Sequence, residues 1–118
     1  MRESTIEKHL VKRVKALGGE VRKVQWIGRR GAPDRVVLRD ADQAATDILR
    51  DYDMQRMTDV QLGKLAREIV GLYICWPELK APGVKPEAHQ LREHKRMRAM
   101  GQRVVVIDSI EGVEEALS

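Results

Sequence analysis

One apolar run of the chain reads Gly31-Ala32-Pro33-Asp34-Arg35-Val36-Val37-Leu38, and a later run reads Tyr73-Ile74-Cys75-Trp76-Pro77-Glu78-Leu79-Lys80. If the two runs pair as neighbouring antiparallel strands, the start of the first lies beside the end of the second. That pairing brings Asp34 next to Glu78. Lys80 follows Glu78 by two residues, so both side chains point to the same face of the strand. The two runs therefore predict two carboxylates and a lysine at one edge of a sheet.

Hydrophobic periodicity on the N-terminal side of these runs predicts one helix and one further strand. Apolar residues recur every three or four positions over residues 4–17, as on one face of an amphipathic helix, and Gly18-Gly19 ends the pattern. Residues 20–26 read as a strand and lead into the basic turn Gly28-Arg29-Arg30-Gly31.

The C-terminal part of the chain predicts a helix, a strand and a short final helix. Residues 87–100 form an amphipathic pattern that Gly101 stops, and residues 110–117 form the last helix. Between them, residues 103–108 are nearly all apolar, which is most easily explained by a parallel strand covered on both faces. A helix between two strands is the normal right-handed crossover of such a parallel pair.

The segment from about 41 to 71 has no strand pattern but contains two helix-like stretches. The second stretch opens on Thr58-Asp59-Val60-Gln61, which matches a capping box. We interpret the segment as a helical insertion between the second and third strands, where a short hairpin would otherwise suffice. Pro77 cannot donate a ladder hydrogen bond and predicts a bulge or a locally open edge. The predicted order is helix, three antiparallel strands, helix, strand and helix, an α/β fold.

Length and composition indicate one globular domain over residues 1–118, with 34% charged and 42% hydrophobic residues. No apolar stretch is long enough to span a bilayer, and the N-terminus lacks the apolar core of a signal peptide, so we expect an intracellular protein and no membrane partner. The single cysteine, Cys75, is expected to be a small buried hydrophobe rather than a reactive thiol. Without a second cysteine, a thiolate zinc site is not expected.

The formal net charge of +4 permits an acidic partner such as nucleic acid, and it equally fits a slightly basic surface with no such role. Aromatic residues total 3% and Phe is absent, so a platform for stacking single-stranded bases is hard to assemble. Recognition of nucleic acid would therefore depend on phosphates and duplex shape.

The order of these motifs resembles the PD-(D/E)xK nuclease superfamily and, within it, the small stand-alone virus-type replication-repair nuclease (VRR-NUC) domains of phages. The matching residues are Glu7, Gly28-Arg29-Arg30-Gly31-Ala32-Pro33-Asp34-Arg35, Glu78-Leu79-Lys80-Ala81-Pro82-Gly83, Gln90, and Gly101 before Val104-Val105-Val106-Ile107-Asp108. The resemblance covers nearly the whole chain except the insertion. It implies a restriction-endonuclease-like αβββαβ core, in which a mixed sheet is flanked by helices.

The resemblance also implies a metal site built from hard oxygen ligands, which suit Mg²⁺ or Mn²⁺. Asp34 and Glu78 are the expected direct ligands, and the resemblance adds the main-chain carbonyl of Leu79. Glu7 would bind the metal directly, reach it through water, or help a second ion. Lys80 would orient the attacking water and offset the charge that grows on the phosphate.

Each of these residues has a simpler alternative reading. Glu7 could be the acid of a capping box with Ser4, and Glu3 is a rival for its catalytic role. A Glu-x-Lys pair on a strand is often only a solvated pair. Gln90, which the resemblance places near the lysine as a further catalytic residue, could be a plain surface residue. The three histidines, His9, His89 and His94, are expected to have surface or structural roles.

Basic residues around these motifs are candidates for contacts with the DNA backbone. Arg29, Arg30 and Arg35 flank Asp34, and Lys85 follows the third strand. Contacts to phosphate would position DNA without reading its sequence. The basic residues of the helix at 87–100 are either further contacts or a solvated helix face; they are Arg92, Lys95, Arg96 and Arg98.

The leading hypothesis is a magnesium- or manganese-dependent DNA endonuclease that hydrolyses phosphodiester bonds as a homodimer in the cytoplasm of a phage-infected host. Its preference for branched DNA such as four-way junctions, and the dimer itself, are implied by the resemblance. Symmetric cutting of a junction needs two active sites, which gives the dimer a mechanical purpose. The alternatives are a nuclease acting on flap, duplex or single-strand ends, and a non-catalytic nucleic-acid-binding module of the same fold.

Overall fold

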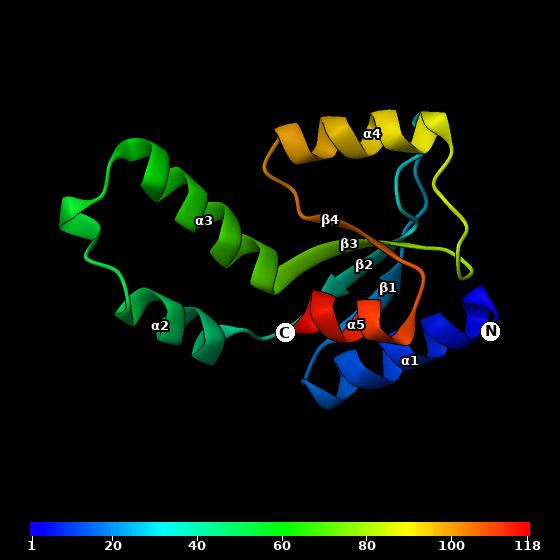
Figure 1. The fold of residues 1–118 in the computed structure, drawn as a ribbon, viewed down its shortest axis with the longest axis horizontal. Coiled ribbons are helices and arrows are strands. Elements are labelled where there is room, and N and C mark those ends of the chain that lie inside the picture. Colours follow the sequence, from blue (N-terminus) through cyan, green and yellow to red (C-terminus); the bar gives the residue numbers. More distant parts are fainter.

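The computed structural model describes residues 1–118 and contains a four-stranded mixed sheet flanked by helices (Figure 1). In chain order the elements are α1 (Glu3–Ala16), β1 (Glu20–Lys23), β2 (Arg35–Leu38), α2 (Asp42–Arg50), the 3-10 helix η1 (Met54–Arg56), α3 (Asp59–Tyr73), β3 (Ile74–Leu79), α4 (Ala88–Ala99), β4 (Val104–Ile107) and α5 (Ile110–Leu117). The strand order is β1-β2-β3-β4, with β3 and β4 parallel and the other pairs antiparallel. The predicted α/β fold and its helical insertion are confirmed.

The sheet separates two layers of helices: α1 and α5 cover one face and α4 covers the other (Figure 1). Ile6, Leu10 and Val14 recur every four residues along α1, so their side chains share one face and are fully buried. They pack against Val37, Cys75, Leu79, Ile107, Val113, Ala116 and Leu117 from β2, β3, β4 and α5. The core therefore lies on the α1–α5 side, and Cys75 is a buried free thiol as expected.

The register of β2 and β3 bears directly on the two predicted acids. Val37 pairs with Cys75 and Leu38 with Ile74. Continued by three residues along each chain, this register sets Asp34 opposite Glu78.

Pro77 accounts for the short ladder between β2 and β3. The backbone N–H groups of Trp76 and Lys80 donate to carbonyls of Arg103 and Ile107 on the β4 side, at 2.9 Å each. Because backbone groups alternate along a strand, the nitrogen of Pro77 faces β2, where it has no hydrogen to donate. The expected locally open edge is found at this place, next to the predicted acids.

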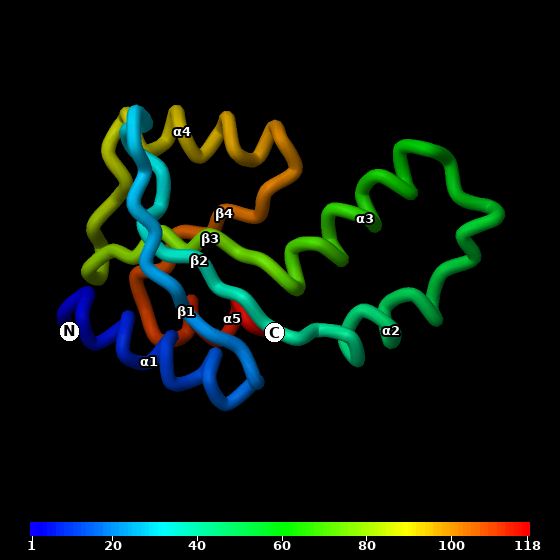
Figure 2. Tube along the Cα trace, turned by 180° about the vertical axis from the view of Figure 1, so that it is seen from behind, coloured from blue at the N-terminus to red at the C-terminus, as the bar shows by residue number.

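The insertion forms a helical hairpin that projects beyond the sheet, as Figures 1 and 2 show. Its base is closed by a hydrogen bond from the Arg39 N–H to the Tyr73 carbonyl, at 3.0 Å. The predicted capping box is confirmed: the Thr58 hydroxyl accepts from the Gln61 N–H, and the Gln61 side chain accepts from the Thr58 N–H. The hairpin contributes to the elongated shape of the molecule, which measures 46 × 31 × 26 Å.

Two expectations are wrong, one about the start of α1 and one about the burial of β4. Helix α1 begins at Glu3 with Arg2 as its N-cap, so Ser4 already lies inside the helix and forms no capping box with Glu7. Strand β4 is parallel to β3 as expected, but it is the outermost strand, and Val106 remains 39% exposed instead of being covered on both faces. None of the helices has the length and apolar character needed to cross a membrane.

Candidate active site

The predicted lysine and the second acid lie on the side of β3 that faces α4. Cys75 and Leu79 belong to the core on the opposite side, so alternation along the strand turns Glu78 toward α4. Lys80, directly after the strand, also contacts α4 through its side chain. The sheet and α4 thus form the two walls of the candidate site.

Glu78 is held by a histidine that the sequence analysis assigned to a structural or surface role. Its side chain is 10% exposed, and its Oε1 lies 2.9 Å from Nε2 of His94, which is fully buried. A carboxylate that loses water needs a hydrogen-bond partner, and the His94 ring supplies one. The other ring nitrogen, Nδ1, is buried without a partner. His94 follows Gln90 by four residues, and this helical spacing is the sequence signal that places both on one face.

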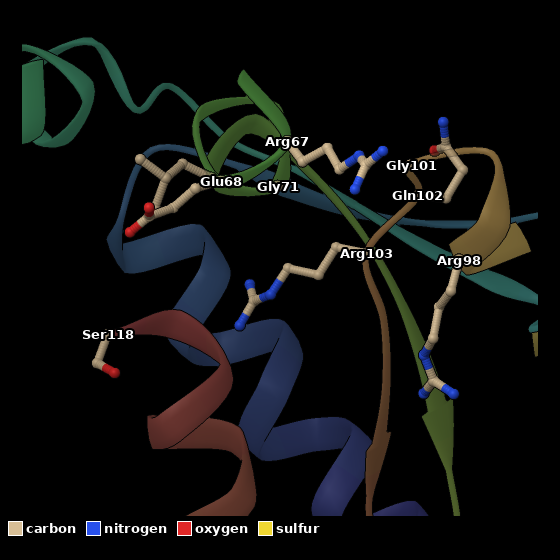
Figure 3. A pocket seen from close by; sticks show the side chains of 9 residues that line it. Arg67, Glu68, Gly71, Arg98, Gly101, Gln102, Arg103 and Ser118 are labelled. Carbon is tan, nitrogen blue, oxygen red and sulfur yellow. The ribbon is translucent and has the colours of Figure 1, made fainter. Parts of the chain in front are cut away.

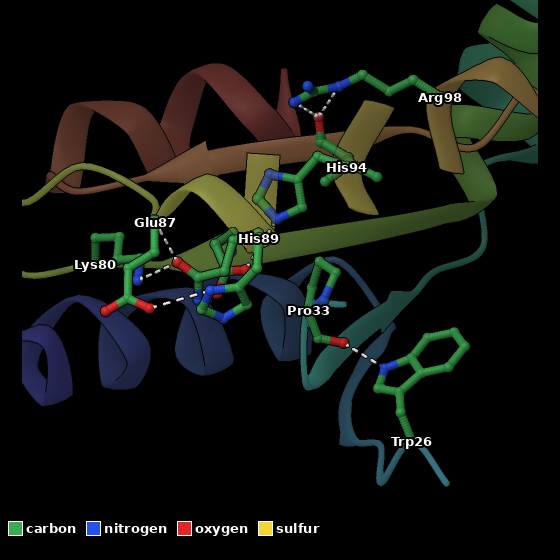
Figure 4. Close-up of polar contacts among 10 residues, drawn as sticks. Trp26, Pro33, Lys80, Glu87, His89, His94 and Arg98 are labelled. Carbon is green, nitrogen blue, oxygen red and sulfur yellow. Dashed lines mark hydrogen bonds and ion pairs between the residues drawn. The ribbon is translucent and has the colours of Figure 1, made fainter. Parts of the chain in front are cut away.

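Lys80 is fixed by the start of α4. Its Nζ donates to Oε1 of Gln90 at 2.8 Å, and the same oxygen accepts the backbone N–H of Glu87 at 2.8 Å. This second bond belongs to the capping box that begins α4. Figure 4 shows Lys80 and Glu87 close together at this helix start. The structure therefore brings Gln90 to the lysine, so the plain-surface alternative for Gln90 does not describe its contacts.

Asp34 and Glu7 are joined by an arginine. The Arg35 guanidinium contacts Glu7 Oε1 at 2.9 Å and Asp34 Oδ1 at 3.1 Å. Partial burial lowers the Arg35 pKa, but the hydrogen bond from Arg35 to Glu7 and the charge of Asp34 outweigh it, so the pKa is raised overall. The Arg35 side chain is 16% exposed and committed to two acids, an environment different from that expected of a free DNA contact.

The three predicted acids do not form one cluster. No group of three or more histidine, cysteine, aspartate and glutamate side chains gathers closely enough to hold a metal ion. Glu7, not its rival Glu3, contacts Arg35. The structure thus links Glu7 to Asp34 through Arg35, whereas the β2–β3 ladder ends at Val37 and Cys75, and Asp34 faces Glu78 only if its register is continued.

The donor set at the β2–β3 edge still suits a magnesium-type ion. The backbone groups of Trp76 and Lys80 face β4, so alternation directs the Leu79 carbonyl toward β2, beyond the last ladder pair. With the carboxylates of Asp34 and Glu78, this edge offers three hard oxygen donors. Magnesium commonly takes only one or two carboxylates and completes its shell with water and substrate phosphate. The donor types at this edge are therefore those that a hard divalent cation takes.

The loop before Asp34 is anchored at both ends. Trp26 donates its indole N–H to the Pro33 carbonyl at 2.8 Å, as Figure 4 shows, and its ring lies 5.4 Å from that of Trp76. Gly31 has a φ of +89°, and a Cβ at this position would lie 2.7 Å from the His89 carbonyl oxygen. Glycine is therefore required where the loop approaches α4, and this approach fixes the chain that leads to Asp34.

The remaining basic candidates lie near the site and are largely exposed. Arg29 contacts Glu93 at 3.2 Å and its side chain is 49% exposed. Arg30 is exposed in the same loop, and Lys85 is exposed between β3 and α4.

A separate cavity of about 390 Å³ lies at the opposite end of β3, between α3, the turn after α4 and the C-terminus. Figure 3 shows Arg67 and Arg103 extending toward it. Its lining consists of Arg67, Glu68, Gly71, Leu72, Arg98, Gly101, Gln102, Arg103 and Ser118. Arg98, a candidate DNA contact of α4, is among them, but none of the predicted catalytic or metal-binding residues is, so this cavity is distinct from the candidate active site.

Comparisons with known proteins agree with the resemblance seen in the sequence. No family model matches the chain. The chain is 38% identical over 109 residues to the candidate nuclease p44 of Acyrthosiphon pisum secondary endosymbiont phage 1, an alignment that covers 92% of this chain and 85% of that protein. A solved structure described as a VRR_NUC domain superposes with a TM-score of 0.64 at 32% sequence identity, covering 96% of this chain and 90% of the other.

Proposed function

Because the chain belongs to the VRR-NUC family of nuclease domains, we propose that it is a metal-dependent DNA endonuclease that cuts branched structures such as four-way junctions. One observation carries the assignment of the site: Glu78 and Lys80 face α4 together, and a residue of α4 holds each of them, at the strand edge opposite Asp34. An isolated solvated Glu-x-Lys pair would have neither of these partners.

Asp34, Glu78 and the Leu79 carbonyl would hold Mg²⁺ or Mn²⁺ at this edge. When bound, the ion supplies a Lewis acid that polarises the scissile phosphate. Lys80 orients the attacking water and offsets the negative charge that develops on the phosphate oxygens. Its ammonium is a compact point charge, and Gln90 restricts where that charge can lie.

Two residues act through others and are positioning residues. His94 orients the carboxylate of Glu78, as outer partners of metal ligands commonly do. Arg35 balances the charge of Asp34 and Glu7, which allows two acids to stand near the phosphate path. Glu7 would then bind the ion directly, reach it through water, or assist a second ion.

The substrate and assembly belong to the same proposal. Arg29, Arg30 and Lys85 would contact DNA phosphates, which favours recognition of shape over sequence. Cutting a four-way junction symmetrically needs two active sites, and a homodimer supplies them. The expected place of action is the host cytoplasm, where the DNA of a phage is replicated and resolved.

The proposal is tested by incubating the chain with four-way junction, flap, duplex and single-stranded DNA in Mg²⁺, Mn²⁺ or EDTA. Asp34→Ala and Lys80→Ala should abolish metal-dependent cutting. Asp53→Ala and Lys64→Ala, which change exposed residues of the insertion, are the matched controls and should cut normally.

Three outcomes would revise the proposal. Cutting that survives both active-site substitutions would place the reaction elsewhere. Equal cutting of linear duplex and junction would remove the preference for branches. Binding without cutting under any metal would favour the non-catalytic module.

A further inference from the structure

A second polar cavity, of about 340 Å³, lies beside the candidate active site between the loop before Asp34 and α4. No hydrophobic residue lines it, and the side chains around it are those of Arg29, Arg30, His89, Arg92, Glu93 and Arg96. We call this cavity the arginine pocket. Four arginines and one glutamate leave it three positive charges with His89 neutral, so it attracts an anion.

The buried carboxylate of Glu93 holds two arginines of the arginine pocket in place. Its side chain is only 3% exposed, and Oε2 accepts Nη1 of Arg29 at 3.2 Å and Nη1 of Arg96 at 3.3 Å. Glutamate is almost never fully buried unless it is paired. Here one buried carboxylate holds two arginines from different elements, whose side chains remain 49% and 61% exposed.

The free face of these arginines has the chemistry of a phosphate site. A guanidinium carries five N–H donors in a planar fork. Arg29 and Arg96 each use one Nη1 group to donate to Glu93, which leaves the other donors for a ligand. The fork matches phosphate oxygens in a bidentate manner. The pocket has no hydrophobic lining residue, and His89 is its one aromatic ring, so it resembles a phosphate site more than a stacking platform for nucleobases.

The arginine pocket is joined to the candidate active site by short pieces of chain. His89, which lines the pocket, precedes Gln90, whose side chain holds Lys80. Gly31 packs against the His89 carbonyl on the way to Asp34. The arginine pocket therefore lies next to the residue of α4 that holds Lys80.

We propose that the arginine pocket binds a backbone phosphate of the cut DNA strand, adjacent to the phosphate at which the strand is cut. Glu93 holds the arginines in place. The inference rests on the proposed function for the identity of the strand, but it concerns binding and not hydrolysis.

The test is equilibrium binding of fluorescein-labelled four-way junction and duplex DNA by the full chain in EDTA, across a range of salt concentrations. Arg96→Gln should weaken binding about tenfold, as the loss of one charged hydrogen bond does. It should also lower the slope of log affinity against log salt by about 0.9, the value for one released phosphate contact on duplex DNA. Arg67→Gln, which removes an exposed arginine from the far cavity, is the matched control and should leave the slope unchanged.

Glu93→Gln distinguishes a pocket whose arginines are positioned by Glu93 from a basic surface that binds DNA by net charge alone. Removing this negative charge should strengthen DNA binding if only net charge matters. If Glu93 positions Arg29 and Arg96, binding should weaken despite the added positive charge. Melting temperatures of all variants show whether the fold is kept. If Glu93→Gln does not fold, the Arg29→Gln/Arg96→Gln double variant tests the pocket, because it alters only exposed side chains.

The two proposals fail in different ways. Equal salt slopes for wild type, Arg96→Gln and Arg67→Gln would overturn the arginine pocket, and so would tighter binding by a folded Glu93→Gln. Pocket-dependent binding by a chain that cuts nothing would keep the pocket and overturn the nuclease function.

Discussion

At the scale of single residues, the contact between Glu78 and His94 is the most informative feature of the candidate site. It buries a carboxylate beside a fully buried ring and leaves the second carboxylate oxygen for another ligand. A metal ligand that is oriented in this way is held ready before the ion arrives. The geometry therefore predicts that His94 affects metal use more than DNA binding.

His94→Gln should lower the cleavage rate about 10- to 100-fold and raise the metal concentration needed for half-maximal activity, as loss of such outer partners does. The matched control is His9→Gln, because His9 contacts Glu114 at 2.8 Å on the far side of the sheet. Metal titrations of cleavage, with DNA affinity measured in EDTA, distinguish the two variants. An unchanged metal titration for folded His94→Gln would remove its positioning role.

Gly31 tests the approach of the loop to α4. Gly31→Ala puts a Cβ 2.7 Å from the His89 carbonyl oxygen at a φ of +89°. We expect a loss of about 2 kcal/mol in the free energy of unfolding, in the range that strained backbone costs. Gly63→Ala in α3, where no atom lies within 4 Å, should instead stabilise by about 0.5–1 kcal/mol. Urea unfolding of the two variants gives both values, and equal midpoints would contradict this reading of Gly31.

At the scale of elements, the α2–α3 hairpin is separable from the core. None of the ten residues of the core cluster comes from it, and its base is the Leu38–Ile74 pair with the Arg39–Tyr73 hydrogen bond. The sheet and both covering helix layers are therefore complete without the hairpin.

Replacing residues 40–72 by Asn-Gly, a sequence that favours a two-residue β-hairpin turn, should leave a cooperatively folding protein. Helical circular dichroism should fall, while the thermal transition stays sharp. A full-length chain carrying Leu65→Ala, which disturbs only the hairpin, is the comparison. Loss of the cooperative transition in the shortened chain would show that the hairpin is part of the folding unit.

Helices α1 and α5 are linked by Glu114, which contacts His9 at 2.8 Å and Arg13 at 2.9 Å. Its hydrogen bond with His9, and then those from Arg13, lower the Glu114 pKa below its ordinary value of 4.5. A carboxyl whose pKa is depressed by folding adds stability above that ordinary value, and the contribution is lost as pH falls through the lowered one. The free energy of unfolding, measured with urea between pH 3 and pH 7, should therefore fall less steeply toward acid pH in Glu114→Gln than in the wild type. Glu111→Gln, which changes an exposed glutamate of the same helix, should keep the wild-type pH dependence. The same pH dependence in both variants would contradict the role assigned to Glu114.

Local sequence predicted the elements well and their ends less well. The Thr58–Gln61 and Ser4–Glu7 pairs match the same capping pattern, yet only the first forms, because α1 starts at Glu3, two residues before the start that a Ser4 cap would give. The antiparallel pairing of β2 with β3 was predictable from the hydrophobic runs.

The long-range side-chain contacts were not predictable from the sequence. Arg35 meets Glu7 across 28 residues, and Arg29 meets Glu93 across 64. Both contacts depend on where α1 and α4 cross the sheet, which no local pattern encodes. His94 was accessible from its four-residue spacing to Gln90, but only once the facing strand was known.

At the scale of the whole molecule, the α2–α3 hairpin projects from the end of the sheet where β3 begins (Figure 1), and the candidate active site lies where β3 ends. The candidate active site and the arginine pocket share α4, so under both proposals this helix would serve cutting as well as holding of the strand. A net charge of +4 on the chain suits the proposed contacts with DNA phosphates.

The central claim is that the β2–β3 edge binds a divalent metal, and Mn²⁺ binding measured by electron paramagnetic resonance tests it without DNA. Wild-type chain should bind Mn²⁺, while Asp34→Asn and Glu78→Gln should each lose at least about tenfold in affinity, as expected when a direct ligand of a hard cation is removed. Glu93→Gln, which removes another buried carboxylate from α4, should bind Mn²⁺ like wild type. Unchanged Mn²⁺ affinity in folded Asp34→Asn and Glu78→Gln would contradict the account.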